Sequence, residues 1–130
     1  MSKFGKHYIV GIVGATGAVG IEIIKCLKER EFPISELHLY SSAKSSGKVL
    51  ATSLGDIVVE EYQLSRARLC DFLFLAVSGE FSLANARLLV AGNGPIVIDN
   101  SSAWRYEADV PLVVCILSTI FSGCWTSHLI

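Results

Sequence analysis

The sequence lacks the features that mark several classes of protein. None of its apolar runs is long enough to span a bilayer, although 52% of the 130 residues are hydrophobic and the mean hydropathy is +0.52. The 11 basic and 12 acidic residues leave a net charge of −1, which gives no field that would attract nucleic acid or an anionic membrane. We therefore expect no nucleic acid and no membrane as a partner.

Patterns for metal ligation are missing as well. The three histidines are scattered, and no Cys-x-x-Cys spacing occurs among the four cysteines, Cys26, Cys70, Cys115 and Cys124. Reduced and mostly buried thiols are therefore expected. Basic residues followed by an apolar run at the N-terminus superficially suggest a signal peptide, but the run passes into a glycine turn and a charged helix. We interpret it as a first strand and expect a cytoplasmic or organelle-matrix protein.

The first forty residues predict a strand, a helix and a second strand. Residues 7–13 form a β-branched run that is typical of a strand buried on both faces of a parallel sheet. Residues 18–31 carry apolar side chains at helical spacing, and Phe32-Pro33 ends this helix. Residues 36–41 then form a second strand. A helical connection implies that the two strands pair in parallel.

The remaining pattern continues the alternation of strands and helices. Residues 49–53 and 57–62 flank the turn 54–56 and predict a hairpin near a sheet edge. An apolar strand at 71–77, a helix at 80–92 and a buried strand at 95–99 follow. The expected fold is α/β, a Rossmann-type, doubly wound and mainly parallel sheet, and the length allows one such domain.

A glycine-rich turn joins the first strand to the first helix. It reads Gly14-Ala-Thr-Gly-Ala-Val-Gly20, a G-x-x-G-x-x-G variant placed where the dinucleotide fingerprint belongs. Gly14 would permit the tight turn, Gly17 would let a pyrophosphate approach the backbone, and Gly20 would let the helix pack closely on the sheet. The N–H groups of residues 16–19 and the helix dipole would bind the anion. The alternative is a glycine-rich turn that binds nothing.

The loop after the second strand distinguishes between the two nicotinamide cofactors. An NAD-binding domain carries Asp or Glu there to bond the ribose 2′-hydroxyl. Here the segment 41–48 reads Ser-Ser-Ala-Lys-Ser-Ser-Gly-Lys, with hydroxyls, two ammonium groups and no carboxylate to repel a 2′-phosphate. This favours NADP as the cofactor. The alternative is a solvated Ser/Lys loop without a ligand.

Five stretches in order resemble the signature segments of the aspartate-semialdehyde dehydrogenase family, over residues 7–114. They are residues 14–20, Arg30-Glu-Phe-Pro33, residues 42–48, Asp99-Asn-Ser-Ser-Ala-Trp-Arg105 and Asp109-Val-Pro-Leu-Val-Val114. The resemblance implies NADPH-dependent reduction of β-aspartyl phosphate to aspartate semialdehyde through a cysteine thioester, with phosphate release. That reaction lies on the route to lysine, threonine and methionine. The family is usually dimeric, so the resemblance also implies a homo-oligomer.

The resemblance also implies roles for particular residues. The cofactor diphosphate would contact Thr16, Gly17, Ala18 and Val19, and the 2′-phosphate would contact Ser42, Lys44 and Ser45. Ser78 and Gly79 would lie beside the cofactor. Arg105, with Asn100 shaping the same pocket, would hold the substrate phosphate, for which a planar guanidinium is suited. Otherwise Arg105 would be a surface residue paired with Glu107 or Asp109. Trp104 is expected to be a packing anchor.

The resemblance ends after residue 114. We expect residues 1–114 to be the NADP-binding domain and residues 115–130, which contain no Asp, Glu, Lys or Arg, to be a divergent apolar tail. The family's nucleophilic Asn-Cys and histidine acid/base find no match, and Cys115 and Cys124 lack an activating neighbour. No residue is therefore assigned as catalytic. The chain alone is expected to be inactive, and the alternative is a non-catalytic NADPH-binding or interaction protein.

Overall fold

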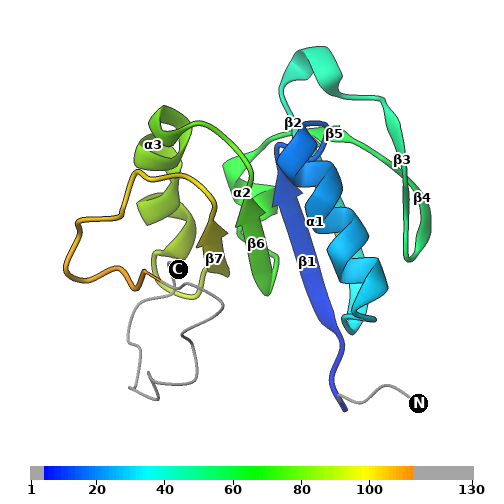
Figure 1. Cartoon of the computed structure of the whole chain (residues 1–130), viewed down its shortest axis with the longest axis horizontal. Coiled ribbons are helices and arrows are strands. Elements are labelled where there is room, and N and C mark those ends of the chain that lie inside the picture. Colours follow the sequence, from blue (N-terminus) through cyan, green and yellow to red (C-terminus); the bar gives the residue numbers. More distant parts are fainter. Residues whose placement is uncertain (1–4, 113–130) are drawn as a thin grey trace.

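The computed structural model describes residues 5–112, which form a five-stranded sheet and a separate hairpin. The sheet has the order β5-β2-β1-β6-β7, and all its strand pairs are parallel. Figure 1 shows β1 near the middle of this sheet. The strands are β1 (Tyr8–Val13), β2 (Ile34–Ser41), β5 (Glu60–Glu61), β6 (Phe72–Leu75) and β7 (Ile96–Asp99).

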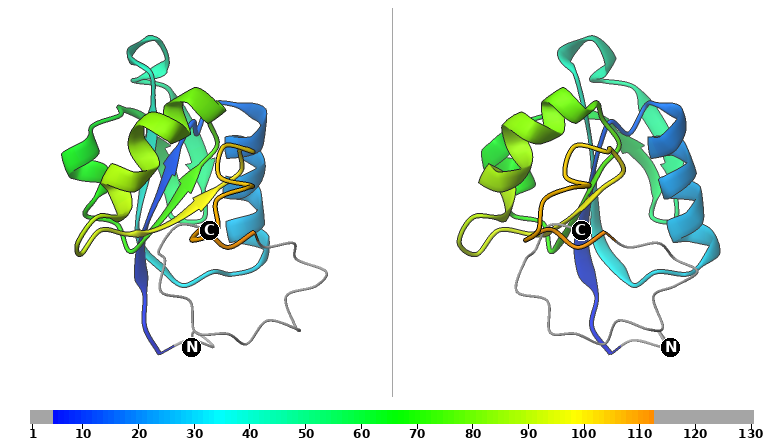
Figure 2. Two further views of the ribbon diagram at one scale, coloured as in Figure 1. Left: turned by 90° about the vertical axis from the view of Figure 1, so that its left-hand side faces the viewer. Right: turned by 60° about the vertical axis from the view of Figure 1, so that its left-hand side comes forward.

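Helices cover both faces of the sheet. Helix α1 (Ala18–Glu29) connects β1 to β2, and α3 (Gly79–Val90) connects β6 to β7. Figure 2 shows the two helices on opposite sides of the sheet, with the short α2 (Leu64–Ala67) on the same side as α3. The predicted doubly wound α/β fold is therefore confirmed. No helix in residues 5–112 is long and apolar enough to cross a membrane.

Each face of the sheet has its own hydrophobic core. Alternate residues of a strand point to opposite faces, so Val10 and Ile12 of β1 face α1 while Val13 faces α3. Val10, Ile12, Leu39, Leu73 and Tyr40 are all at most 1% exposed. Complete burial of one such side chain stabilises the folded state by about 1.5–3 kcal/mol. This is why apolar runs in the sequence indicate the strands of the sheet.

The ends of the elements differ slightly from the prediction, and the second hairpin strand differs more. Helix α1 ends at Glu29 and β2 begins at Ile34, each two residues earlier than expected. The expected strand 57–62 was wrong as one unit. Its first part, β4 (Gly55–Val58), pairs with β3 (Val49–Thr52), and its last part is β5, which pairs with β2. The break lies at Val59, whose side chain is buried in the core beneath α1.

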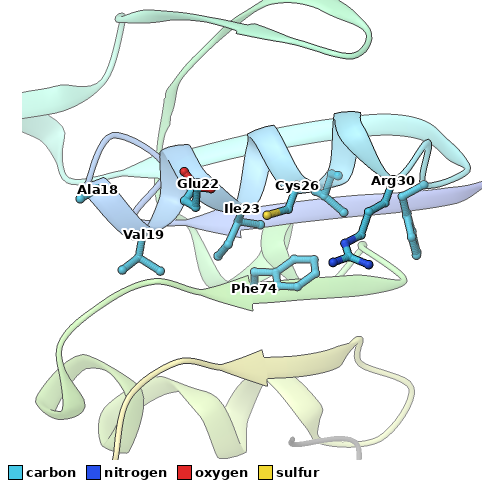
Figure 3. A pocket seen from close by; sticks show the side chains of 9 residues that line it. Ala18, Val19, Glu22, Ile23, Cys26, Arg30 and Phe74 are labelled. Carbon is cyan, nitrogen blue, oxygen red and sulfur yellow. The ribbon is translucent and has the colours of Figure 1, made fainter. Parts of the chain in front are cut away.

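Strands β6 and β7 are buried on one face only, which corrects the expectation of a buried strand at 95–99. Val97 is fully buried against α3, but Ile96 and Ile98 are only half-buried. No helix of residues 5–112 covers the other face, and a hollow of about 520 Å³ lies there beside α1. Figure 3 shows Ile23 and Cys26 of α1 pointing toward Phe74 of β6 in this hollow.

Candidate cofactor-binding site

A second hollow, of about 610 Å³, lies at the carboxyl ends of the strands. Strand β1 pairs with β2 on one side and with β6 on the other, so the two crossovers diverge at this point. Ligands of doubly wound sheets bind in the crevice at such a switch point. The lining residues lie at or after the ends of β1, β2, β5 and β6: Val13, Gly14, Thr16, Gly17, Ser41, Ser42, Ala43, Glu61, Tyr62, Ala76, Val77, Ser78 and Phe81.

Gly14 and Gly20 are required by the shape of the loop after β1. Gly14 has a φ of +82°, and a Cβ there would lie 2.2 Å from the backbone oxygen of Ala76. A Cβ on Gly20 would lie 2.2 Å from the oxygen of Gly14, because the first turn of α1 packs directly against the loop. These contacts agree with the tight turn and the close helix packing that the glycine motif predicts.

Gly17 has open space in front of it. A Cβ there would meet only the oxygen of Gly14, at the ordinary contact distance of 3.5 Å. Gly17 is also the N-cap of α1, no side chain caps the helix, and its first turn has no acidic residue. The positive end of the helix dipole therefore faces the hollow with no capping side chain and no carboxylate in the first turn of α1, an arrangement that suits a phosphate.

The Ser/Lys segment after β2 reaches the hollow in part. Ser42 and Ala43 line it, whereas Lys44 and Ser45 lie further along in a 3₁₀ turn, η1 (Ala43–Ser45). Lys44 is exposed, and within residues 5–112 it makes no ion pair. The segment itself contains no carboxylate, as expected. The structure adds one from elsewhere, because Glu61 of β5 pairs with Ser41 and lines the same hollow.

An aromatic wall closes the side between β5 and α3. The rings of Tyr62 and Phe81 meet edge to face, with centroids 5.0 Å apart. The Tyr62 hydroxyl donates to Oδ1 of Asn85 at 3.2 Å, and burial raises the pKa of Tyr62 above its ordinary value. Ser78 lines the hollow and its hydroxyl accepts a hydrogen bond from the Phe81 N–H at 3.4 Å. Gly79 begins α3 but does not line the hollow.

Sequence reasoning missed several lining residues, among them Glu61, Tyr62, Val77 and Phe81. Val77 directly follows the apolar run of β6, so the rule for carboxyl ends of strands could have identified it. Glu61 and Tyr62 could not be found in that way, because the two-residue β5 was expected to belong to the hairpin. Conversely, Ala18 and Val19 stand at the start of α1, just outside the lining.

Asn100 and Arg105 follow β7, at the same edge of the sheet but outside the hollow. The Asn100 N–H donates to the oxygen of Leu75 at 3.1 Å. The Arg105 side chain is exposed and borders a depression of about 30 Å³ with Trp104. The alternative pairing of Arg105 with Glu107 or Asp109 is wrong: Arg105 makes no ion pair within residues 5–112, and Asp109 is bound by two hydrogen bonds from Arg87, at 2.5 and 2.9 Å.

The cysteines that the structure describes do not belong to this site. Cys70 is buried, and burial raises the pKa of its thiol to about 12, while Cys26 is half-buried and lines the first hollow, between α1 and β6. Within residues 5–112 no group of three or more metal-ligating side chains gathers. Cys115, Cys124 and His128, and with them the expected tail, lie outside the described residues.

Comparison with known families agrees with this geometry. Residues 9–119 match the family described as "Semialdehyde dehydrogenase, NAD binding domain". Aspartate-semialdehyde dehydrogenase of Streptomyces akiyoshiensis is 46% identical over 105 residues, which cover 81% of this chain and 30% of the relative. The enzyme of Aquifex aeolicus is 44% identical over 108 residues, which cover 82% of this chain and 32% of the relative.

Solved structures of the same enzymes share the fold. Aspartate-semialdehyde dehydrogenase II of Vibrio cholerae, complexed with ASA, superposes with a TM-score of 0.75 at 38% identity, over 84% of this chain and 35% of that one. The Candida albicans enzyme with NADP gives 0.68 at 32% identity, over 82% and 33%. The chain thus spans about a third of the length of these relatives. It belongs to the semialdehyde dehydrogenase family and corresponds to its NAD-binding domain.

Proposed function

We propose that the hollow at the switch point binds NADP and that this domain forms the cofactor-binding part of an aspartate-semialdehyde dehydrogenase. The reaction would be the NADPH-dependent reduction of β-aspartyl phosphate to aspartate semialdehyde, with release of phosphate. Similarity to enzymes of that name supports the reaction, and similarity to the Candida albicans enzyme, whose structure was solved with NADP, supports the cofactor.

The observation that carries the proposal is the open approach at Gly17. A dinucleotide needs a backbone surface that its pyrophosphate can reach, together with a positive partial charge to balance it. The loop after β1 offers both, since Gly17 has no close neighbour beyond the Gly14 oxygen and stands at the uncapped start of α1. The residues present therefore fit the cofactor that the family uses.

We assign the cofactor contacts as follows. Thr16 to Val19 would contact the diphosphate, through backbone N–H groups except at Gly17, whose N–H donates to the Gly14 oxygen at 3.1 Å, and Ser78 and Gly79 would lie beside the cofactor. Ser42, Lys44 and Ser45 would contact the adenosine 2′-phosphate, Lys44 and Ser45 from η1. The flexible stem of an exposed lysine can bring its ammonium group over the rim of the hollow. NADPH bound in this way would supply the hydride.

Substrate contacts are assigned to the segment after β7. Arg105 would hold the phosphate of β-aspartyl phosphate with its planar guanidinium, and Asn100 would help to shape that pocket. Both stand at the strand edge that carries the cofactor hollow, because β7 runs parallel to β6. The groups that would form and break bonds to the substrate are not assigned to any residue of this chain.

The cofactor assignment is tested by titrating the chain with NADPH and NADH and following cofactor fluorescence. The wild-type chain should prefer NADPH by one to two decades, since a charge-assisted contact to the 2′-phosphate is worth about 1–3 kcal/mol. Lys44→Glu should remove or reverse this preference. Lys28→Glu is the matched control, because it makes the same charge change on the last turn of α1, away from the hollow. Equal affinities for both cofactors, before and after Lys44→Glu, would contradict the assignment.

A further inference from the structure

The segment after β7 is held by hydrogen bonds that converge on Asp99. The Ser101 N–H donates to Oδ1 of Asp99 at 2.8 Å, and the Ser101 hydroxyl donates to Oδ2 at 3.0 Å. The hydroxyl of Ser82, which lies on α3, donates to the same Oδ2. A carboxylate can accept about four hydrogen bonds, and three of these positions are filled here. Asp99 thereby ties the start of the segment to α3.

Ser82 is the junction of this network. It is 0% exposed, and its hydroxyl accepts a hydrogen bond from the Trp104 indole N–H at 2.7 Å while donating to Asp99. Any small residue would fill the space of Ser82, but a side chain at this position must both accept and donate to complete the chain of bonds. Among the described residues no buried side-chain polar atom lacks a partner, so the network is closed.

The ring of Trp104 is also in contact with Arg87. The guanidinium of Arg87, on α3, lies 4.9 Å from the centre of a Trp104 ring. The same guanidinium makes the two hydrogen bonds to Asp109. Trp104 is therefore fixed between two side chains of one helix. The next residue along the chain is Arg105, whose own side chain is exposed and makes no ion pair within residues 5–112.

We propose that Ser82 is a positioning residue that holds the Asn100–Arg105 segment, through Trp104 and Asp99, in the conformation that binds a phosphate group. This inference rests on the phosphate-binding role proposed above for Arg105. Helix α3 starts at the rim of the cofactor hollow, where Ser78 caps it, and carries Ser82 one turn later. One rigid helix thus sets the distance between the cofactor and the bound phosphate, as a reaction between the two requires.

The test titrates the whole 130-residue chain with inorganic phosphate and, separately, with NADPH, and follows amide and indole signals by ¹H–¹⁵N NMR. Trp125→Phe identifies the Trp104 indole signal. Ser82→Ala should shift that signal and weaken phosphate binding about tenfold, with NADPH affinity unchanged within about twofold. Trp104→Phe, which keeps an aromatic ring but removes the N–H donor, should weaken phosphate binding in the same way. Ser65→Ala, an exposed serine on α2, is the matched control and should change nothing.

The outcomes separate this inference from the function on which it rests. Arg105→Lys should weaken phosphate binding without moving the Trp104 indole signal. If Ser82→Ala shifts the indole signal but binds phosphate as the wild type does, the positioning role is wrong. Equal losses of phosphate and NADPH affinity would also overturn it, because they indicate a general structural role. A wild-type chain that binds NADPH but no phosphate contradicts the phosphate-binding role of Arg105 and this inference with it, whereas failure to bind NADPH contradicts the proposed cofactor function.

Discussion

Replacing Gly17 by valine should remove cofactor binding and leave the fold intact. The Cβ would meet only the Gly14 oxygen, at 3.5 Å, so the protein itself has room for the new side chain. The backbone of Gly17 has φ −79° and ψ 169°, an extended conformation that valine adopts readily. Valine is a poorer N-cap than glycine, but it also restricts the unfolded chain, so the free energy of unfolding should change by less than about 1 kcal/mol.

The effect on binding follows from where the side chain must go. Its methyl groups project into the hollow from the start of α1, into the space that a pyrophosphate needs to reach the backbone N–H groups. Forcing extra carbon atoms into a fitted contact costs about 1–3 kcal/mol, which corresponds to one to two decades in the dissociation constant. The loss of backbone hydrogen bonds to the phosphate adds to this cost.

Gly20→Val is the matched comparison, three residues further along the same motif. Its Cβ would lie 2.2 Å from the Gly14 oxygen and 2.7 Å from Cα of Ala15, so the first turn of α1 would have to move away from the loop. We expect a loss of about 3 kcal/mol in the free energy of unfolding and a fall of roughly 12–20 °C in Tm. Far-UV circular dichroism and NADPH titration of both variants test the argument together. Unchanged NADPH affinity in Gly17→Val would mean that the loop is only a turn.

Two other predictions concern titration and one concerns activity. Burial raises the pKa of the Cys70 thiol to about 12 from its ordinary value of 9.0, so the protonated thiol favours the folded state. Its contribution to the free energy of unfolding is complete below pH 9 and falls as the pH rises toward 12, and denaturant titrations of Cys70→Ala should lack this contribution. The Arg87 hydrogen bonds lower the pKa of Asp109, so their contribution to the free energy of unfolding is present above pH 3.8, the ordinary pKa, and is lost as the pH falls below it. Below pH 3.8 the Tm of Asp109→Asn should therefore depend less on pH than the wild-type Tm. The 130-residue chain alone should not reduce NADP in the presence of aspartate semialdehyde and phosphate, because neither Cys26 nor Cys70 lines the cofactor hollow. Turnover that is lost in Cys115→Ser or Cys124→Ser would contradict this expectation.

The fold could be predicted from the sequence largely because its elements are local and strongly patterned. The β-branched run of β1, the helical spacing of α1 and the stop at Phe32-Pro33 each depend on neighbouring residues alone. The number of buried faces depends on distant parts of the chain. An apolar run such as Phe72–Leu75 is the same whether one face or both are covered, and here Phe72 and Phe74 remain half-buried beside α1.

In the candidate site, too, the features that depend on neighbouring residues could be predicted and those that depend on distant residues could not. Gly14, Gly17 and Gly20 could be assigned from the sequence, because the turn at Gly14, the open approach at Gly17 and the contact of Gly20 with the Gly14 oxygen all lie within the motif, although Gly14 also lies close to the distant Ala76. Glu61 and Tyr62 could not be assigned. They reach the hollow because Val59 turns into the core and residues 60–62 then run along the edge of β2. The hydrophobic pattern around them is equally compatible with a longer hairpin strand.

The segment that carries Arg105 shows why a motif can identify a residue and still leave its conformation open. The resemblance singled out Asn100 and Arg105, and Trp104 was expected only to pack. In the structure its indole N–H is bonded to Ser82, 22 residues earlier in the chain, and its ring lies against Arg87. Nothing in the spacing of Ser82 along α3 distinguishes it from a small core residue. The arginine would be functional only in a fixed loop, and the residues that fix the loop belong to a helix whose sequence pattern indicates nothing beyond packing.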